Sequence, residues 1–185
     1  IRALADEEVM LTSRNGNSVR FKHSDVRPTG RNTRGVRGMA LRNGDEVVSM
    51  QLVESDKSVL LVTEHGYGKR VPIDQFRITK RGGLGVKTMP VTDRNGHIIG
   101  ARLVEDVDQA MLVTDGGMII RFRVTDVREM SRYAGGVRLV RLRKGEAVMG
   151  LERLADVDED DEVEALETDG EEAIEEAPTA EELAA

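Results

Sequence analysis

The stretch that decides the fold is Lys80-Arg81-Gly82-Gly83-Leu84-Gly85-Val86-Lys87, in which cations flank three glycines. Weaker copies of it are Arg31-Asn32-Thr33-Arg34-Gly35-Val36-Arg37 and Arg132-Tyr133-Ala134-Gly135-Gly136-Val137-Arg138. Gly35 lies 50 residues before Gly85, and Gly136 lies 51 residues after it. A cationic loop that returns on a fixed period predicts a repeated scaffold whose surface meets an anionic partner at regular intervals.

The rest of the chain repeats with the same period. Three segments that end in glycine align with one another, namely residues 10–16 (MLTSRNG), 60–66 (LLVTEHG) and 111–117 (MLVTDGG). Short apolar runs that begin at Val47, Ile98 and Val148 close the three units. We therefore place repeats at residues 7–54, 57–105 and 108–155, within a domain over residues 1–155.

Each repeat is typical of short β-strands. Runs rich in Val, Ile, Leu and Met alternate with the turn pairs Asn15-Gly16, Asn43-Gly44 and Asn95-Gly96, which favour tight turns. About four such strands fit into a repeat of about 50 residues, which is the size of a propeller blade. The expected fold is all-β, a propeller-like array of three four-stranded blades. Because a blade cannot bury its faces alone, three blades form an incomplete ring, and we expect further repeats upstream in the parent protein.

Alternation along the strands predicts which side chains face solvent. In Arg20-Phe21-Lys22 and in Arg121-Phe122-Arg123-Val124 the cations lie on one face and the apolar side chains on the other. We expect the apolar faces to pack against the next blade and the cations to stay on the solvent side. Phe21, Phe76 and Phe122 are accordingly predicted to be core residues.

The net charge of −7 conceals two oppositely charged regions. Residues 156–185 contain 15 acidic residues and no Lys or Arg, so the preceding residues carry 19 acidic residues and all 27 Lys and Arg, a balance of +8. Such asymmetry indicates a polyanion-binding body, with the acidic segment as a possible competitor. We predict that residues 156–185 form a disordered acidic tail.

The glycine loops and the surrounding cations are the candidate binding site. Gly35, Gly85 and Gly136 have a structural interpretation, because glycine adopts backbone angles that other residues avoid. The paired Gly82 and Gly83 would let backbone amides approach a phosphate. A cationic band with few aromatic residues suits the backbone of double-stranded DNA better than stacked single strands. The candidate DNA-binding residues are Lys80, Arg81, Gly82, Gly83, Lys87, Arg20, Lys69, Arg70, Arg121, Arg123, Arg31, Arg34, Arg37, Arg132 and Arg138.

Catalytic sites find little support in this sequence. The chain has no cysteine, which excludes disulfides, thiolate metal sites and a cysteine nucleophile. His23, His65 and His97 share no repeat position and no metal-ligand spacing, and there is no phosphate-binding loop with a Gly-Lys-Ser or Gly-Lys-Thr ending. We expect no catalytic residue, no metal and no cofactor in this segment. No apolar run is long enough to cross a membrane, so no membrane partner is expected.

Several long motifs resemble the C-terminal domain of DNA gyrase A. They are Gly66-Tyr67-Gly68-Lys69-Arg70, Gly85-Val86-Lys87 followed by residues 91–96 (VTDRNG), and residues 108–117 (DQAMLVTDGG). The resemblance implies a six-bladed β-pinwheel, in which strands invade neighbouring blades, and this chain resembles its last three blades and acidic tail.

The resemblance also implies a function. It implies non-specific wrapping of duplex DNA around a basic rim, in support of the ATP-dependent negative supercoiling of a type II topoisomerase. The implied partners are double-stranded DNA, the rest of gyrase A, and gyrase B, in a bacterial, cytoplasmic and chromosome-associated heterotetramer. Mg²⁺ and ATP would belong to the parent complex, with ATP on gyrase B.

One departure from the family keeps alternatives open. The family's signature box, Gln-Arg-Arg-Gly-Gly-x-Gly, belongs to its first blade, whereas Thr79-Lys80-Arg81-Gly82-Gly83-Leu84-Gly85 lies in what resembles the fifth. We interpret it as the repeat-equivalent loop, and we expect the true box upstream of this sequence. The alternatives are the C-terminal domain of topoisomerase IV, a protein-interaction propeller with an acidic partner, and an enzyme built in a propeller channel.

Overall fold

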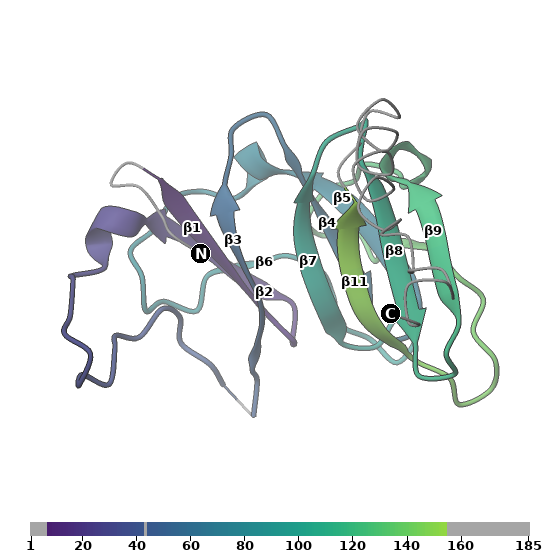
Figure 1. Ribbon diagram of the computed structural model, residues 1–185, viewed down its shortest axis with the longest axis horizontal. Coiled ribbons are helices and arrows are strands. Elements are labelled where there is room, and N and C mark those ends of the chain that lie inside the picture. Colours follow the sequence, from purple (N-terminus) through teal and green to yellow (C-terminus); the bar gives the residue numbers. More distant parts are fainter. Residues whose placement is uncertain (1–6, 43, 155–185) are drawn as a thin grey trace, which may run out of the picture. The chain divides into compact units, whose positions relative to one another are not determined.

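Three antiparallel β-sheets follow one another in chain order in the computed structural model, which describes residues 7–42 and 44–154 (Figure 1). The predicted tail at residues 156–185 lies outside the described residues. Each repeat begins with a hairpin and a single 3₁₀ turn, and it ends with a strand that pairs with the first strand of that hairpin. The all-β, pinwheel-like prediction is confirmed.

The strands have the following bounds. The first repeat holds β1 (Glu8–Ser13), β2 (Asn17–Lys22) and β3 (Val47–Val53), with the 3₁₀ turn η1 (His23–Asp25). The second holds β4 (Ser58–Thr63), β5 (Tyr67–Pro72), η2 (Ile73–Gln75), β6 (Val86–Lys87) and β7 (Ile98–Val104). The third holds β8 (Gln109–Thr114), β9 (Ile119–Arg123), η3 (Val124–Asp126), β10 (Val137–Arg138) and β11 (Val148–Leu154).

The fourth strand of a sheet comes from the following repeat. The first sheet has the order β3-β1-β2-β6, and the second has the order β10-β5-β4-β7. Val86 pairs with Ser18, and Val137 pairs with Gly68, so the end of each glycine loop becomes an edge strand of the preceding sheet. Within the described residues the third sheet has three strands, β11-β8-β9. The four strands of a blade are therefore not all drawn from one 50-residue repeat, which the sequence period alone did not reveal.

The core forms between neighbouring sheets, and this explains the continuous apolar run in β4. Val59 and Leu61 pack with Met10 of the first repeat and Phe76 of the second, whereas Leu60 and Val62 pack with Leu112 of the third. Both faces of β4 are thus covered, as expected for a strand that reads as apolar throughout rather than alternating. Strand β3 lies against β7, and β7 lies against β11 (Figure 1).

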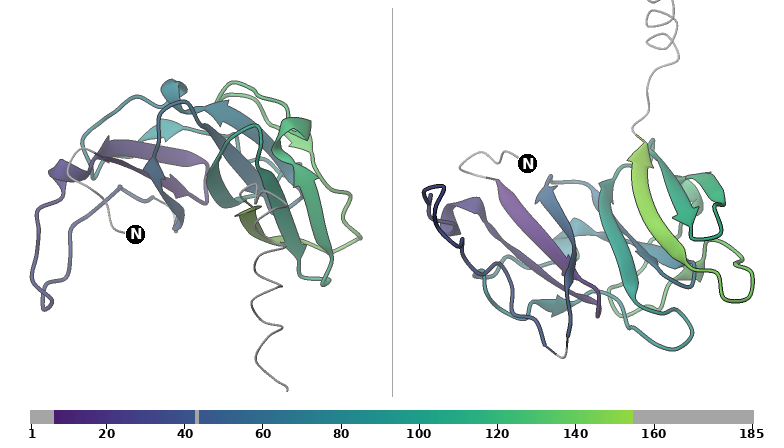
Figure 2. Two further views of the ribbon diagram at one scale, coloured as in Figure 1. Left: turned by 45° about the horizontal axis from the view of Figure 1, so that its top comes forward. Right: turned by 60° about the horizontal axis from the view of Figure 1, so that its bottom comes forward.

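Two of the predicted turn pairs can be compared with the structure. Asn15-Gly16 connects β1 and β2, with Gly16 at φ +85°, as expected for a hairpin. Asn95-Gly96 instead precedes β7 at the end of a long connection, where the buried Asn95 side chain organises the turn by accepting from the Thr92 backbone and hydroxyl. The corresponding connection of the first repeat, between β2 and β3, extends away from its sheet (Figure 2).

Candidate nucleic-acid interface

The last glycine of each loop allows close approach to the preceding sheet. A Cβ built on Gly85 would overlap the carbonyl oxygen of Ser18, and one on Gly136 would lie 2.8 Å from the carbonyl oxygen of Gly68. Gly35 has the same positive φ, +75°, but no described atom within 4 Å of such a Cβ. The structural interpretation of Gly85 and Gly136 is confirmed, because their loops enter a sheet where a side chain would collide with the backbone.

The paired glycines are held by the first repeat. The Gly82 amide donates to the carbonyl oxygen of Gly38 at 2.6 Å, and the Gly83 carbonyl oxygen accepts from the amide of Ala40 at 2.8 Å. Since the Gly82 amide already has a partner, the expectation that it contacts a phosphate is wrong. Gly83 remains exposed, and so does the nearby Lys80.

Arg81 and Arg132 pin their loops to the preceding repeat. Arg81 donates from Nε to the carbonyl oxygen of Asp25 at 2.9 Å and from Nη1 to that of Arg37 at 3.0 Å. Arg132 donates from Nη1 to the carbonyl oxygen of Lys87 at 2.8 Å. Arg37 and Lys87 hold equivalent places in their repeats, so one contact recurs at both junctions. Both guanidinium groups hold their loops against the preceding repeat, and only their remaining N–H groups are available to bind a partner.

Arg20 and Arg70 lie between blades rather than on the solvent face. Arg20 pairs with Glu8 at 2.5 Å and donates to the carbonyl oxygens of Ile73 and Phe76, 2.8 and 3.1 Å away in the next repeat. Arg70 pairs with Asp106 and donates from Nε to the carbonyl oxygen of Val127 at 2.7 Å, also in the next repeat. The prediction that Arg20 faces solvent is wrong, and the DNA-binding candidate Arg70 lies in the same kind of position, because carbonyl groups around the next 3₁₀ turn need donors when blades stack.

Lys69 is fully buried, and the prediction that it contacts DNA is wrong. Its Nζ donates to three carbonyl oxygens of the third glycine loop, those of Ser131, Arg132 and Ala134, at 2.9, 2.8 and 2.9 Å. Burial lowers the pKa of the Lys69 amine to about 8, and repulsion by Arg132 acts in the same direction. Three carbonyl acceptors favour the ammonium form, so Lys69 is a cationic cap inside the fold.

The remaining candidates stay exposed. They lie on the three glycine loops, on the short strands that these loops form, and on β9, an edge strand of the third sheet within the described residues. Within the described residues none of them has a carboxylate oxygen within 4.0 Å of its cationic nitrogens. These cations, called the exposed cation set below, are Arg31, Arg34, Arg37, Lys80, Lys87, Arg121, Arg123 and Arg138.

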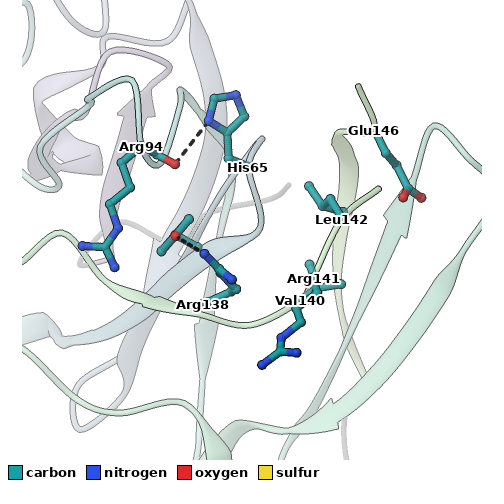
Figure 3. Close-up of a pocket in the computed structure, with 8 residues that line it drawn as sticks. His65, Arg94, Arg138, Val140, Arg141, Leu142 and Glu146 are labelled. Atoms are coloured by element: carbon teal, nitrogen blue, oxygen red, sulfur yellow. Dashed lines mark hydrogen bonds between the residues drawn. The ribbon is translucent and has the colours of Figure 1, made fainter. Parts of the chain in front are cut away.

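A basic hollow of about 420 Å³ at the junction of the second and third repeats was not predicted from the sequence. It is lined by His65, Tyr67, Arg94, Arg138 and Arg141, together with an apolar wall and Glu146 (Figure 3). The glycines on either side of Tyr67 indicate only a turn, and Arg94 and Arg141 lie in different repeats. The one signal in the sequence is that Arg94 occupies the place of Arg42, immediately before an Asn-Gly pair.

Two classes of site receive no support from the described part of the chain. Residues 7–42 and 44–154 contain no group of three or more His, Asp or Glu side chains arranged to hold a metal ion. In the same part of the chain, no helix has the length and apolar character needed to cross a membrane.

Comparison with known proteins gives the family. The model of the DNA gyrase C-terminal domain, beta-propeller, matches residues 7–54, 57–105 and 108–155. The chain belongs to this family. The DNA gyrase A protein of Chlamydia pneumoniae is 46% identical over 159 residues, which cover 85% of this chain and 19% of that protein. The DNA gyrase A protein of Escherichia coli (strain K12) is 45% identical over 157 residues, which cover 84% and 18%. The chain therefore spans about a fifth of the length of these two proteins.

Solved structures share the fold. The C-terminal domain of DNA topoisomerase IV matches with a TM-score of 0.80 and 29% identity, over 90% of this chain and 52% of that one. The DNA gyrase A C-terminal domain matches with a TM-score of 0.77 and 29% identity, over 82% and 52%. The chain thus covers about half of each of these two solved domains.

Proposed function

We propose that this chain binds and wraps duplex DNA non-specifically, as the last three blades of the C-terminal domain of gyrase A. The observation that carries the proposal is the exposed cation set, which recurs on the loops and edge strands of three successive repeats without local carboxylates. Cations of this kind neutralise phosphates and position a duplex without reading its sequence. The parent enzyme would be an ATP-hydrolysing type II topoisomerase, bacterial and cytoplasmic, with the rest of gyrase A, gyrase B, Mg²⁺ and ATP as its further components.

The energetics favour a distributed contact. Bending about 20–30 base pairs costs on the order of several kcal/mol, which many phosphate contacts must offset. If the eight residues of the exposed cation set each neutralise one phosphate, log K should fall with log salt at a slope of about −7. The gyrase assignment is supported by the gyrase A proteins of Chlamydia pneumoniae and Escherichia coli, which are 46% and 45% identical. The solved gyrase A and topoisomerase IV domains are both 29% identical and do not distinguish the two.

The test is a topological one. Relaxed circular DNA is incubated with increasing amounts of the chain, a topoisomerase relaxes the unconstrained remainder, and the change in linking number is measured after the protein is removed. A shift that grows with protein supports wrapping by these blades. Binding without a shift would reduce the proposal to DNA binding, and no binding at low salt would leave the protein-interaction propeller as the better description.

A further inference from the structure

The basic hollow at the second junction is built by residues of two repeats. His65, Tyr67 and Arg94 come from the second repeat, and Arg138 and Arg141 come from the third. The backbone pairing of Arg138 with Tyr67, in the β5–β10 ladder, brings the two groups together. Figure 3 shows His65, Arg94 and Arg138 gathered at one end of the hollow, with Glu146 at the other end. The hollow therefore forms where the third repeat donates its strand to the second sheet.

Tyr67 orders two of the three guanidinium groups. Its side chain is buried, with 5% of the residue exposed. The Arg94 Cζ lies 4.9 Å from the ring centroid, and the Arg138 Cζ lies 5.5 Å from it. Arg138 also donates from Nη2 to the Tyr67 hydroxyl oxygen at 2.9 Å. A buried ring that contacts both guanidinium groups restrains their positions before any ligand arrives, which lowers the entropic cost of binding.

The hollow carries a net positive charge. Among the described residues, no carboxylate oxygen lies within 4.0 Å of the cationic nitrogens of Arg94, Arg138 or Arg141. Glu146 also lines the hollow, as a carboxylate that accepts from the Thr114 hydroxyl at 2.6 Å and the Arg143 amide at 2.8 Å, so three arginines face one anionic group. Arg94 first, and then Arg138, hold the pKa of the Tyr67 phenol below its usual value, in agreement with a positive local potential.

From this geometry we infer that the hollow receives the phosphate backbone of DNA, with Arg94 and Arg138 at one end and Arg141 beside them on its rim. The inference rests on the proposed function, which it deepens by naming one fixed anchor among otherwise diffuse contacts. Guanidinium groups bind phosphate through charge-assisted, paired hydrogen bonds, and the two that Tyr67 already orders do so with less reorganisation.

The first junction has a reduced version of the same arrangement. Asn17 stands at the place of Tyr67, Arg42 at that of Arg94, and Lys87 at that of Arg138. The hollow there is smaller, about 290 Å³, and it is lined by Asn15, Asn17, Arg42, Asp45 and Leu84. It lacks the aromatic ring and has one arginine in its lining instead of three, so it should hold phosphate more weakly.

Tyrosine fluorescence gives a direct test. The chain has two tyrosines and no tryptophan, so Tyr133→Phe leaves Tyr67 as the sole emitter, and Tyr133 is 70% exposed. In this background, pyrophosphate is titrated at constant ionic strength, and a saturable change in Tyr67 emission is expected. Arg141→Gln should weaken binding at least about tenfold, and Arg141→Lys should weaken it less. Arg77→Gln is the control of equal charge, because Arg77 is exposed and does not line the hollow.

The DNA arm separates the two sources of phosphate. A mixed-sequence duplex should produce the same change in Tyr67 emission, and pyrophosphate should compete with it. A response to pyrophosphate but not to DNA would overturn the backbone assignment in favour of a free phosphate compound. DNA binding with no change in Tyr67 emission on addition of either probe would overturn phosphate binding in the hollow, without contradicting the proposed DNA-binding function. Far-UV circular dichroism of each variant verifies that a lost response is not lost folding.

Discussion

The Lys69 ammonium lies 2.9 Å from the carbonyl oxygen of Ser131, a residue of the following repeat. The equivalent residue of the first repeat is Val19, and the loop that packs there instead carries Gly82 and Gly83, one of which bonds to Gly38. The two junctions thus hold their glycine loops by different means. At one, a buried cation satisfies the loop's carbonyl groups, and at the other, the backbone of the loop pairs with a neighbouring connection.

Replacing this cation should destabilise the second junction. Lys69→Met retains an apolar stem but removes the donor shared by three carbonyl oxygens. The Ser131 oxygen keeps its bond from the Ala134 amide, whereas those of Arg132 and Ala134 lose this donor, and leaving buried carbonyl groups unpaired is costly. We expect the free energy of unfolding to fall by about 1–3 kcal/mol at neutral pH, measured by urea denaturation. A variant as stable as the parent would mean that the cap contributes nothing net.

The same pair of proteins should differ in their response to pH. Burial lowers the pKa of Lys69 to about 8 in the folded chain, against 10.5 for the unperturbed amine. Below pH 8 both states hold the proton, and between pH 8 and 10.5 the unfolded state holds more protons, so stability from this group rises with pH. The difference in free energy of unfolding between parent and Lys69→Met should therefore shift in favour of the parent across this range. A flat difference would place the folded-state pKa close to that of a free lysine.

Two glycines with the same backbone conformation form a matched pair. Gly35 and Gly85 both have φ +75°, but only at Gly85 would a Cβ overlap the Ser18 carbonyl oxygen. Gly35→Ala should cost about 1 kcal/mol, for the backbone angle alone. Gly85→Ala should cost clearly more, because β6 must move away from β2 or be lost from the first sheet. Equal costs in thermal or urea unfolding would show that the close approach is unimportant.

Substitution of an exposed arginine should mainly weaken DNA binding, and substitution of an arginine that lies between blades should mainly lower the stability of the fold. Arg34→Gln removes a member of the exposed cation set, so it should lower DNA affinity and reduce the salt slope by about 0.9 with little change in unfolding. Arg70→Gln removes an ion pair with Asp106 and a hydrogen bond to Val127, so it should lower stability first. Filter binding at several salt concentrations and urea denaturation measure the two effects. The reverse pattern would contradict the assignment of these residues.

Removal of residues 156–185 should tighten DNA binding at low salt. The deletion removes 15 acidic residues and leaves a chain with a balance of +8. The gain should diminish as salt is added, because competition between an acidic segment and DNA is electrostatic. An unchanged affinity at low salt would show that this segment does not compete. A segment of equal length with its acidic residues replaced by Ser and Gly distinguishes charge from length.

The period of the sequence was sufficient to predict the strands, the all-β class and the structural role of Gly85 and Gly136. These features depend on local chemistry, namely apolar runs, turn glycines and the recurrence of both every 50 or 51 residues. The cationic character of the surface also follows from composition. Because every repeat carries the same signals, an error in one can be corrected by the other two.

Tertiary structure alone decided which cations are available. Alternation assigns Arg20 to the face opposite Phe21, but it does not reveal that carbonyl oxygens of Ile73 and Phe76 lie on that side and need donors. The burial of Lys69 is likewise determined by a loop that lies more than 60 residues away in sequence. The hollow around Tyr67 has the same origin. The exchange of β6 and β10 between repeats was implied by the family resemblance but not by the period. Contacts between blades join residues a full period apart, and a repeat pattern describes each unit without describing what its neighbour presents to it.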